Sequence, residues 1–202
     1  MLIVGLAGGI ATGKSLVARE AATLPGVAVL DADKIAWETY LQGTSVYTQL
    51  VARFGETILS EGGEIDRKKL GAIVFQDEEA RRFLNSVVHP AVGLRLYELA
   101  EQHRAQSTKM LVIETALLLE SEYAVRSFYD YVILVKATAE AQIQRLLARG
   151  KISREEAERK VRARIPIEAQ IAKADFVLDT SGAVEETKAK AREIFTKLLS
   201  ST

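Results

Sequence analysis

Residues 8–15 form a glycine-rich segment whose residue types and spacing suit phosphate binding. Gly8, Gly13, Lys14 and Ser15 satisfy the pattern Gly-x4-Gly-Lys-Ser/Thr, between an apolar run and a helical run at 16–22. In that setting backbone N–H groups and a helix N-terminus surround the phosphates, Lys14 reaches the β- and γ-phosphates, and the Ser15 hydroxyl ligates Mg²⁺. The alternative is a glycine-rich turn that carries Lys-Ser by chance, which the strand-to-helix context disfavours. We expect the ATP-binding residues to be Gly9, Ile10, Ala11, Thr12, Gly13, Lys14, Ser15 and Leu16.

Acidic residues follow two further apolar runs, and they are candidates for the acceptor side of a phosphoryl transfer. Asp31 and Asp33 follow the run at 27–30, and Glu114 follows the run at 110–113. Ligands of an open parallel sheet bind beyond the carboxyl ends of its strands, so these carboxylates can face the phosphate segment. Asp31 or Asp33 could orient a hydroxyl and accept its proton, or could help hold Mg²⁺. Glu114 could contact the metal through water. The alternatives are a helix cap, more so for Asp31, and a solvated strand end for Glu114.

The elements that must position these residues are five short apolar runs separated by mostly helical stretches. The runs are nearly all apolar rather than alternating, which is typical of strands buried on both faces of a parallel sheet. The helical stretches favour βαβ connections. We therefore predict an α/β fold, with a P-loop NTPase core built on a five-stranded parallel sheet flanked by helices. The predicted strands are 2–6, 27–30, 110–113, 131–135 and 176–178.

The stretch between the second and third predicted strands is too long for one crossover helix, so we predict an inserted helical subdomain there. His89-Pro90 is expected to separate two of its helices, because proline disfavours helix in the residue before it and suits a helix start. The predicted helices of this subdomain are 36–54, 68–75, 78–88 and 91–103.

The C-terminal third of the chain has clear helix boundaries. A helix at 140–149 is expected to end at Gly150. Ser153 with Glu156 forms a capping box for the next helix. A final amphipathic helix is predicted at 183–199.

Composition excludes several kinds of chemistry. The 202 residues include no cysteine, which rules out disulfides, thiolate catalysis and cysteine-based zinc sites. Lys plus Arg and Asp plus Glu number 27 each, so there is no basic excess to attract nucleic acid or an anionic membrane. No run approaches the ~20 apolar residues of a membrane span, and the N-terminus lacks a signal-peptide pattern. We expect a cytoplasmic protein without nucleic-acid or membrane partners, as a monomer or weak homo-oligomer.

Residues 5–15, residues 31–36 and a series of later elements together resemble, along almost the whole chain, the dephospho-coenzyme A kinase family. Residues 5–15 are similar to the family's GLTGGIGSGKS segment, and 31–36 to its DAD-x-IA element. Further matches, in order, are an IDR-to-HP run, a PLLFE-like element, a Q-x-x-R pattern and a closing AD-x-VI-x-NSG element. They are carried by residues 65–67, Leu70, Phe75, Leu84, Asn85, His89 and Pro90, then 117–120, Gln142 with Arg145, and 174–182.

The resemblance implies ATP-dependent phosphorylation of the ribose 3′-hydroxyl of dephospho-CoA, with Mg²⁺ as cofactor, in the last step of coenzyme A synthesis. It also implies one kinase domain over 1–202 with three parts. These are a nucleotide-binding core at 1–36, 109–139 and 166–202, a substrate-binding subdomain at 37–108, and a helical lid at 140–165.

Carried over by position, the resemblance makes Asp33 the catalytic base, acting with Lys14 and Arg145 at the phosphates. Arg149 lies one helical turn beyond Arg145 on the same face and would assist in ATP binding. Arg67 and His89 would bind the substrate together with Asp33. The alternatives are a solvated surface arginine and a histidine that only caps a helix.

Four positions depart from the family pattern, and two rival functions stand beside the one that the resemblance implies. Ala116 replaces a usual proline, Arg164 a glutamine, Gln170 a lysine and Thr180 an asparagine. We hypothesise that Arg164 restores the positive charge lost at Gln170. If the Arg164→Gln variant keeps normal affinity for ATP, this hypothesis fails. One rival is another P-loop kinase, acting on a nucleotide or small metabolite. The other is an ATP-binding regulatory protein without catalysis; a GTPase switch is disfavoured because the guanine-reading Asn-Lys-x-Asp element is missing.

Overall fold

The computed structural model describes residues 1–115, 118–119, 125–150, 152–162 and 167–201. They divide into two compact units. One comprises Met1–Asp31 with Ala100–Thr202, and the other comprises Ala32–Leu99. The first chain boundary between the units therefore falls inside the Asp31-Ala32-Asp33 element. Among the described residues, no helix has the length and hydropathy of a transmembrane span.

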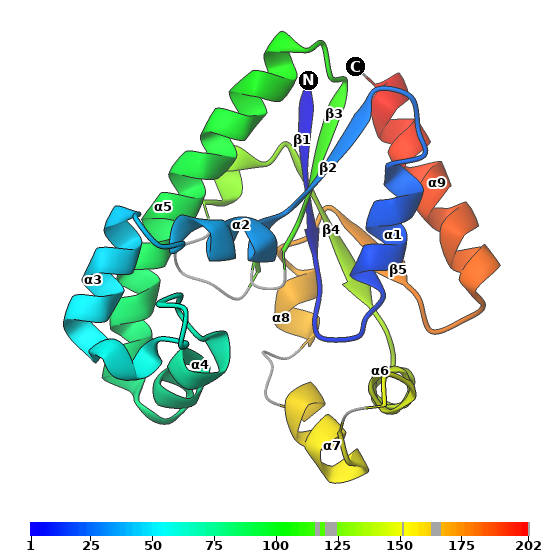
Figure 1. The fold of residues 1–202 in the computed structure, drawn as a ribbon. Helices are drawn as coiled ribbons and strands as arrows, with labels where there is room; N and C mark the ends of the chain where they lie inside the picture. The colour runs from blue at the N-terminus through cyan, green and yellow to red at the C-terminus, as the bar shows by residue number, and fades with distance from the viewer. Residues whose placement is uncertain (116–117, 120–124, 151, 163–166, 202) are drawn as a thin grey trace. The chain divides into compact units, whose positions relative to one another are not determined.

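The first unit is built on a parallel β-sheet of five strands in the order β2-β3-β1-β4-β5 (Figure 1). This confirms the predicted fold class, and each strand lies within one residue of its predicted limits. Because all strands run the same way, their carboxyl ends share one edge of the sheet. The strands are β1 (Leu2–Ala7), β2 (Val27–Asp31), β3 (Met110–Glu114), β4 (Tyr131–Lys136) and β5 (Phe176–Asp179).

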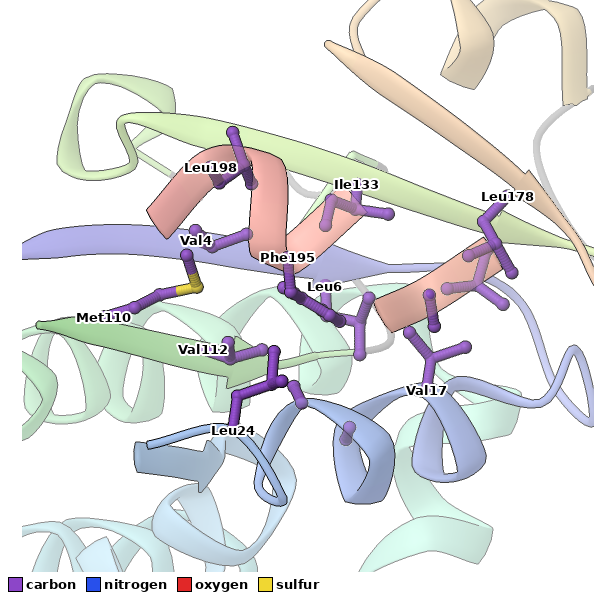
Figure 2. Close-up of a cluster of buried hydrophobic side chains, with 14 residues drawn as sticks. Val4, Leu6, Val17, Leu24, Met110, Val112, Ile133, Leu178, Phe195 and Leu198 are labelled. Carbon is purple, nitrogen blue, oxygen red and sulfur yellow. The ribbon is translucent and has the colours of Figure 1, made fainter. Parts of the chain in front are cut away.

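One face of the sheet is covered by α1 (Lys14–Ala21) and α9 (Val184–Ser200). Figure 2 shows the core between these layers, where Phe195 of α9 and Val17 of α1 lie against Leu6 and Val112 of the strands. All four of these side chains are fully buried. At roughly 1.5–3 kcal/mol for each large apolar side chain removed from water, this layer fixes α1 against the end of β1.

Further helices of this unit are α6 (Ala139–Ala148), α7 (Arg154–Arg162) and the short α8 (Ile167–Ile171), with the 3₁₀ turn η2 (Arg126–Phe128) before β4. The predicted ends are confirmed: Gly150 has a φ of 73° just after α6, and the Ser153 Oγ accepts the Glu156 N–H at 3.2 Å. Ile143 and Leu146 of α6 and Ala157 of α7 form a small buried cluster that includes Ala11 of the glycine-rich segment. Helices α6 and α7 are thereby packed onto the glycine-rich segment.

The second unit is helical, with the 3₁₀ turn η1 (Glu56–Ile58) between its helices. Its core gathers around Leu50, Ile58 and Leu70, all buried. Its other elements are α2 (Ala32–Thr39), α3 (Ser45–Phe54), α4 (Arg67–Gln76) and α5 (Glu78–Ala105), of which α5 continues beyond Leu99 into the first unit.

Two predicted helix boundaries in this unit are wrong. The single helix predicted at 36–54 is two helices, because Gly43 takes a φ of 93° and the Thr44 hydroxyl caps α3 by accepting the Tyr47 N–H at 3.1 Å. The break predicted at His89-Pro90 is absent, since Pro90 lies inside the continuous α5. Proline costs this helix one N–H donor. Apolar residues on both sides of it, Val87, Val88 and Ala91, pack against the same core and hold the helix together.

Candidate nucleotide-binding and catalytic site

The predicted phosphate-binding loop joins β1 directly to α1, at the carboxyl edge of the sheet. Gly8 has a φ of 149°, and a Cβ there would lie 2.3 Å from the Val135 carbonyl oxygen. Gly13, which precedes the first residue of α1, takes a left-handed φ of 92°. Both glycines of the motif are therefore required by the backbone path. The path ends at the N-terminus of α1, where helical N–H groups lack a carbonyl one turn earlier and favour anions.

The Lys14 side chain folds back over this loop. Its Nζ donates to the carbonyl oxygens of Gly8 at 2.8 Å and Gly9 at 3.0 Å. The Thr12 hydroxyl also donates to Gly9 O, at 3.0 Å. The predicted ATP-binding residues 9–16 comprise this turn and the first residues of α1. The ammonium group thus lies over the turn, which is where the β- and γ-phosphates of a nucleotide bind in such loops.

Ser15 and Glu114 come together at the same edge, as the sequence pattern suggested. The Ser15 hydroxyl donates to Glu114 Oε1 at 2.8 Å. Glu114 ends β3 and is in register with Asp31 at the end of β2. Mg²⁺ is commonly bound by one or two protein oxygens, with water and substrate phosphates as its other ligands, and Ser15 with Glu114 fits that requirement. Within the described residues there is no group of three or more His, Cys, Asp or Glu that could hold a metal by itself.

Arg145 of α6 is an arginine whose side chain reaches the loop. Its guanidinium donates to the Ala11 carbonyl oxygen at 3.1 Å, and to the Oγ1 and carbonyl oxygen of Thr180 at 3.0 and 2.5 Å. Arg149 is the exposed residue that follows the last turn of α6. The described contacts thus bring Arg145, but not Arg149, onto the loop.

A cavity of about 420 Å³ lies beside the loop. Gln170, which stands where the family pattern has lysine, lines this cavity and is only 3% exposed. A buried amide costs far less than an unpaired buried ammonium, so glutamine suits this environment. Ala116 and Arg164, and positions 117 and 120 of the PLLFE-like element, lie outside the described residues. The cavity is lined by Gly9, Thr12, Lys136, Ala137, Thr138, Ala139, Gln142, Val161, Ile167 and Gln170.

Asp33 lies in the first turn of α2 and is exposed. With the rest of α2, it belongs to the second unit. Asp31, two residues earlier, belongs to the first. Two peptide links limit the separation of their Cα atoms to about 7 Å, whatever the conformation between them. The chain itself therefore keeps Asp33 close to the strand end that carries Asp31.

The second unit has its own cavity, of about 400 Å³, at the ends of α2 and α4. The Arg67 guanidinium lies 5.5 Å from the centroid of the Trp37 ring, and its positive charge acts on the hydroxyl of Tyr40. Burial raises the pKa of Tyr40, so this phenol stays protonated at neutral pH. The cavity is lined by Trp37, Tyr40, Leu41, Gln42, Ser60, Glu64, Ile65, Asp66, Arg67 and Lys68.

His89 lies elsewhere in this unit, half-buried in the middle of α5, which removes its suggested alternative as a cap at a helix start. Burial lowers its pKa, so the imidazole is neutral at pH 7.

Sequence reasoning missed two features of these sites. Thr180 was noted only as a departure from a family pattern, although its place at the carboxyl end of β5 already pointed to the site edge. The second feature is the pair of Trp37, in the last turn of α2, and Tyr40, one residue beyond that helix; two aromatic residues three positions apart are the signal that could have found it.

Comparisons with known proteins agree with this architecture. A family model described as dephospho-CoA kinase matches residues 2–186. A curated dephospho-CoA kinase of Geobacter sulfurreducens is 42% identical over 201 residues, which are 98% of each chain. A solved Thermus thermophilus structure is 31% identical with a TM-score of 0.79, over 98% of this chain and 97% of that one. A Campylobacter jejuni dephospho-CoA kinase structure (24% identity, TM-score 0.72, 98% of both chains) shares the fold. The family match and the near-complete coverage of these relatives show that the chain belongs to the dephospho-CoA kinase family.

Proposed function

We propose that this protein transfers the γ-phosphoryl group of ATP to the ribose 3′-hydroxyl of dephospho-CoA, giving CoA and ADP. The observation that carries the proposal is the loop at the carboxyl edge of the sheet, with Lys14 over its turn and Ser15 bonded to Glu114. Membership of the dephospho-CoA kinase family supplies the acceptor.

On the nucleotide side, the loop N–H groups and the start of α1 bind the phosphates, and Lys14 leaves the loop carbonyls to meet the β- and γ-phosphate oxygens. Arg145 adds a second positive charge, and Arg149 assists at the rim of the site. Ser15 and Glu114 would hold Mg²⁺, with Asp33 as the alternative carboxylate. Bound Mg²⁺ offsets charge on the β- and γ-phosphates.

On the acceptor side, Asp33 is proposed to be the general base. Its carboxylate would orient the 3′-hydroxyl and accept its proton as the oxygen attacks the γ-phosphorus. The exposure of Asp33 and its two-residue tether to Asp31 support this role. The in-line attack forms the new P–O bond, and the β–γ bridging bond to ADP breaks.

The cavity of the second unit is proposed to receive a part of dephospho-CoA away from the reacting hydroxyl. Arg67, whose guanidinium lies over the Trp37 ring, keeps donors for phosphate or amide oxygens. The exposed part of Trp37 offers an apolar surface beside it. A neutral His89 would serve as a hydrogen-bonding group rather than a charge.

The three-part division proposed from the sequence assigns these roles to a core at 1–36, 109–139 and 166–202, a substrate-binding part at 37–108 and a lid at 140–165. In this division the lid helices, packed on Ala11, exclude water from the phosphates and limit ATP hydrolysis. A cytoplasmic location belongs to the same proposal.

The test is ADP release from Mg-ATP with and without dephospho-CoA, with the product identified by mass. Release that requires dephospho-CoA and yields CoA supports the proposal. ADP release with another nucleotide or metabolite, but not with dephospho-CoA, would indicate a different kinase. ATP binding without turnover on any acceptor would indicate a regulatory protein.

A further inference from the structure

Thr180 forms hydrogen bonds with several parts of the candidate nucleotide site, which its position in the sequence did not suggest. It follows the last residue of β5 and is only 1% exposed. Its hydroxyl oxygen lies 2.6 Å from the Thr12 carbonyl oxygen and 3.2 Å from that of Lys136, and it accepts the Arg145 Nη1–H at 3.0 Å. A hydroxyl has one proton, so the closer Thr12 carbonyl is its better acceptor. One buried group thus links the phosphate loop, the end of β4 and α6.

Neutral oxygens hold the Arg145 guanidinium wherever the structure describes its contacts. Its described partners are the Ala11 carbonyl and the hydroxyl and carbonyl of Thr180. In the part of the chain that the structure describes, no carboxylate forms an ion pair with it. The arginine is therefore fixed in direction while its charge is available for an anion.

The loop is shaped to admit this contact. A Cβ at Gly13 would lie 3.3 Å from the Thr180 hydroxyl oxygen and 3.6 Å from Arg145 Nη1. The absence of a side chain at Gly13 thus leaves the space in which the arginine and the threonine meet, directly at the N-terminus of α1.

The residue after Thr180 anchors the same helix at its start. The Ser181 hydroxyl accepts the Thr138 N–H at 2.9 Å, and Thr138 caps α6 by accepting the Ala141 N–H at 3.3 Å. Two consecutive residues therefore hold α6 at its first turn and at Arg145. These two attachments fix the position of the first turn of α6 and the orientation of the Arg145 side chain.

We propose that Thr180 is a positioning residue for ATP binding: its hydroxyl holds Arg145 against residues 11–13 of the phosphate loop, so that the guanidinium is directed at the nucleotide phosphates. The inference rests on the proposed function only in assigning Arg145 to those phosphates. It also gives the threonine at this position a defined task, although the family pattern has asparagine there.

The first experiment compares Thr180→Val, which keeps the shape and removes the hydroxyl, with Thr180→Ser, which keeps the hydroxyl. Thr187→Val is the matched control, because Thr187 is a buried threonine of α9 (2% exposed) that lies outside the site. Loss of a hydrogen bond to a charged group predicts that Thr180→Val raises the KM for ATP roughly 10- to 100-fold. Thr180→Ser should stay within about threefold of wild type, and the KM for dephospho-CoA should change little in any variant. An ATP KM in Thr180→Val equal to that in Thr187→Val overturns the proposal.

A double-mutant cycle tests whether Thr180 acts through the arginine. If it does, adding Thr180→Val to Arg145→Met should change ATP affinity less than twofold, whereas independent effects would multiply. Affinity is measured by direct titration with a non-hydrolysable ATP analogue, which needs no acceptor. This readout stays valid if dephospho-CoA is the wrong substrate, and fully multiplicative effects would refute the positioning role.

Discussion

Replacing Gly8 with alanine should damage nucleotide binding by displacing the loop rather than by removing a contact. The new Cβ would lie 2.3 Å from the Val135 carbonyl oxygen, whereas real Cβ atoms do not approach closer than about 3.0 Å. The backbone must therefore move by at least 0.7 Å, the difference between these two distances. The Gly8 carbonyl oxygen accepts a hydrogen bond from Lys14 Nζ, so the shift also displaces the lysine side chain. Displacements of this size at a reacting site lower kcat/KM for ATP by roughly 10- to 100-fold.

The matched control for this change is Gly55→Ala. Gly55 also has a positive φ, of 74°, but a Cβ there would meet nothing within 4 Å. That variant should lose only the cost of holding a non-glycine residue at a φ of 74° and a ψ of 179°, about 1–3 kcal/mol in the free energy of unfolding, and keep its activity within twofold. The assay is steady-state ADP release at saturating dephospho-CoA with ATP varied, on variants whose folding is checked by circular dichroism. If folded Gly8→Ala has the same kcat/KM for ATP as Gly55→Ala, the steric argument is wrong.

Four further changes test other residues. Asp33→Asn should lower kcat ~10²- to 10⁴-fold if Asp33 is the base, and near-normal turnover would remove it from that role. Glu114→Gln should raise the Mg²⁺ concentration needed for half-maximal activity, measured by Mg²⁺ titration at fixed ATP; an unchanged midpoint argues against a metal contact. Trp37→Leu should raise the KM for dephospho-CoA roughly 3- to 10-fold, while Phe75→Leu, at a ring 86% exposed in the same unit, should not; equal effects would dismiss the cavity. Burial lowers the pKa of His89, so as pH falls the imidazole is protonated in the unfolded chain before it is protonated in the folded protein. The free energy of unfolding should therefore decrease as pH drops below about 6.5. Urea titrations at pH 7 and pH 5 should show a smaller decrease in His89→Gln than in the wild type.

The sequence pattern was sufficient for the sheet and the phosphate loop because both depend on local information. A strand buried on both faces needs a short apolar run, and each of the five runs became a strand of the parallel sheet. The loop needs glycines at fixed positions between a strand and a helix, and Gly8 and Gly13 have the backbone angles that exclude other residues. Lys14 and Ser15 follow Gly13 directly in the sequence, so their positions relative to the loop are local information as well.

Local signals failed where packing outweighed them. Pro90 should have interrupted a helix, but Val87, Val88 and Ala91 share one core across it, and α5 continues. The opposite error occurred at Gly43, where a polar turn with a threonine cap divides a stretch whose composition suited one helix. At Pro90, packing against residues distant in sequence stabilises the continuous helix. At Gly43, a single backbone angle ends one helix before the next begins.

The sequence alone therefore determined the fold class, the phosphate loop and the residues available for the chemistry, because periodicity, glycine positions and motif spacing are properties of neighbouring residues. Only the tertiary structure decided that Glu114 meets Ser15 across 99 positions, and that Thr180 joins Thr12 and Arg145 across 168 and 35. Such contacts arise because parallel strands bring their carboxyl ends to one edge whatever their order in the chain. A threonine that is a mere departure from a pattern in the sequence becomes, at that edge, the buried group that holds an arginine to the loop.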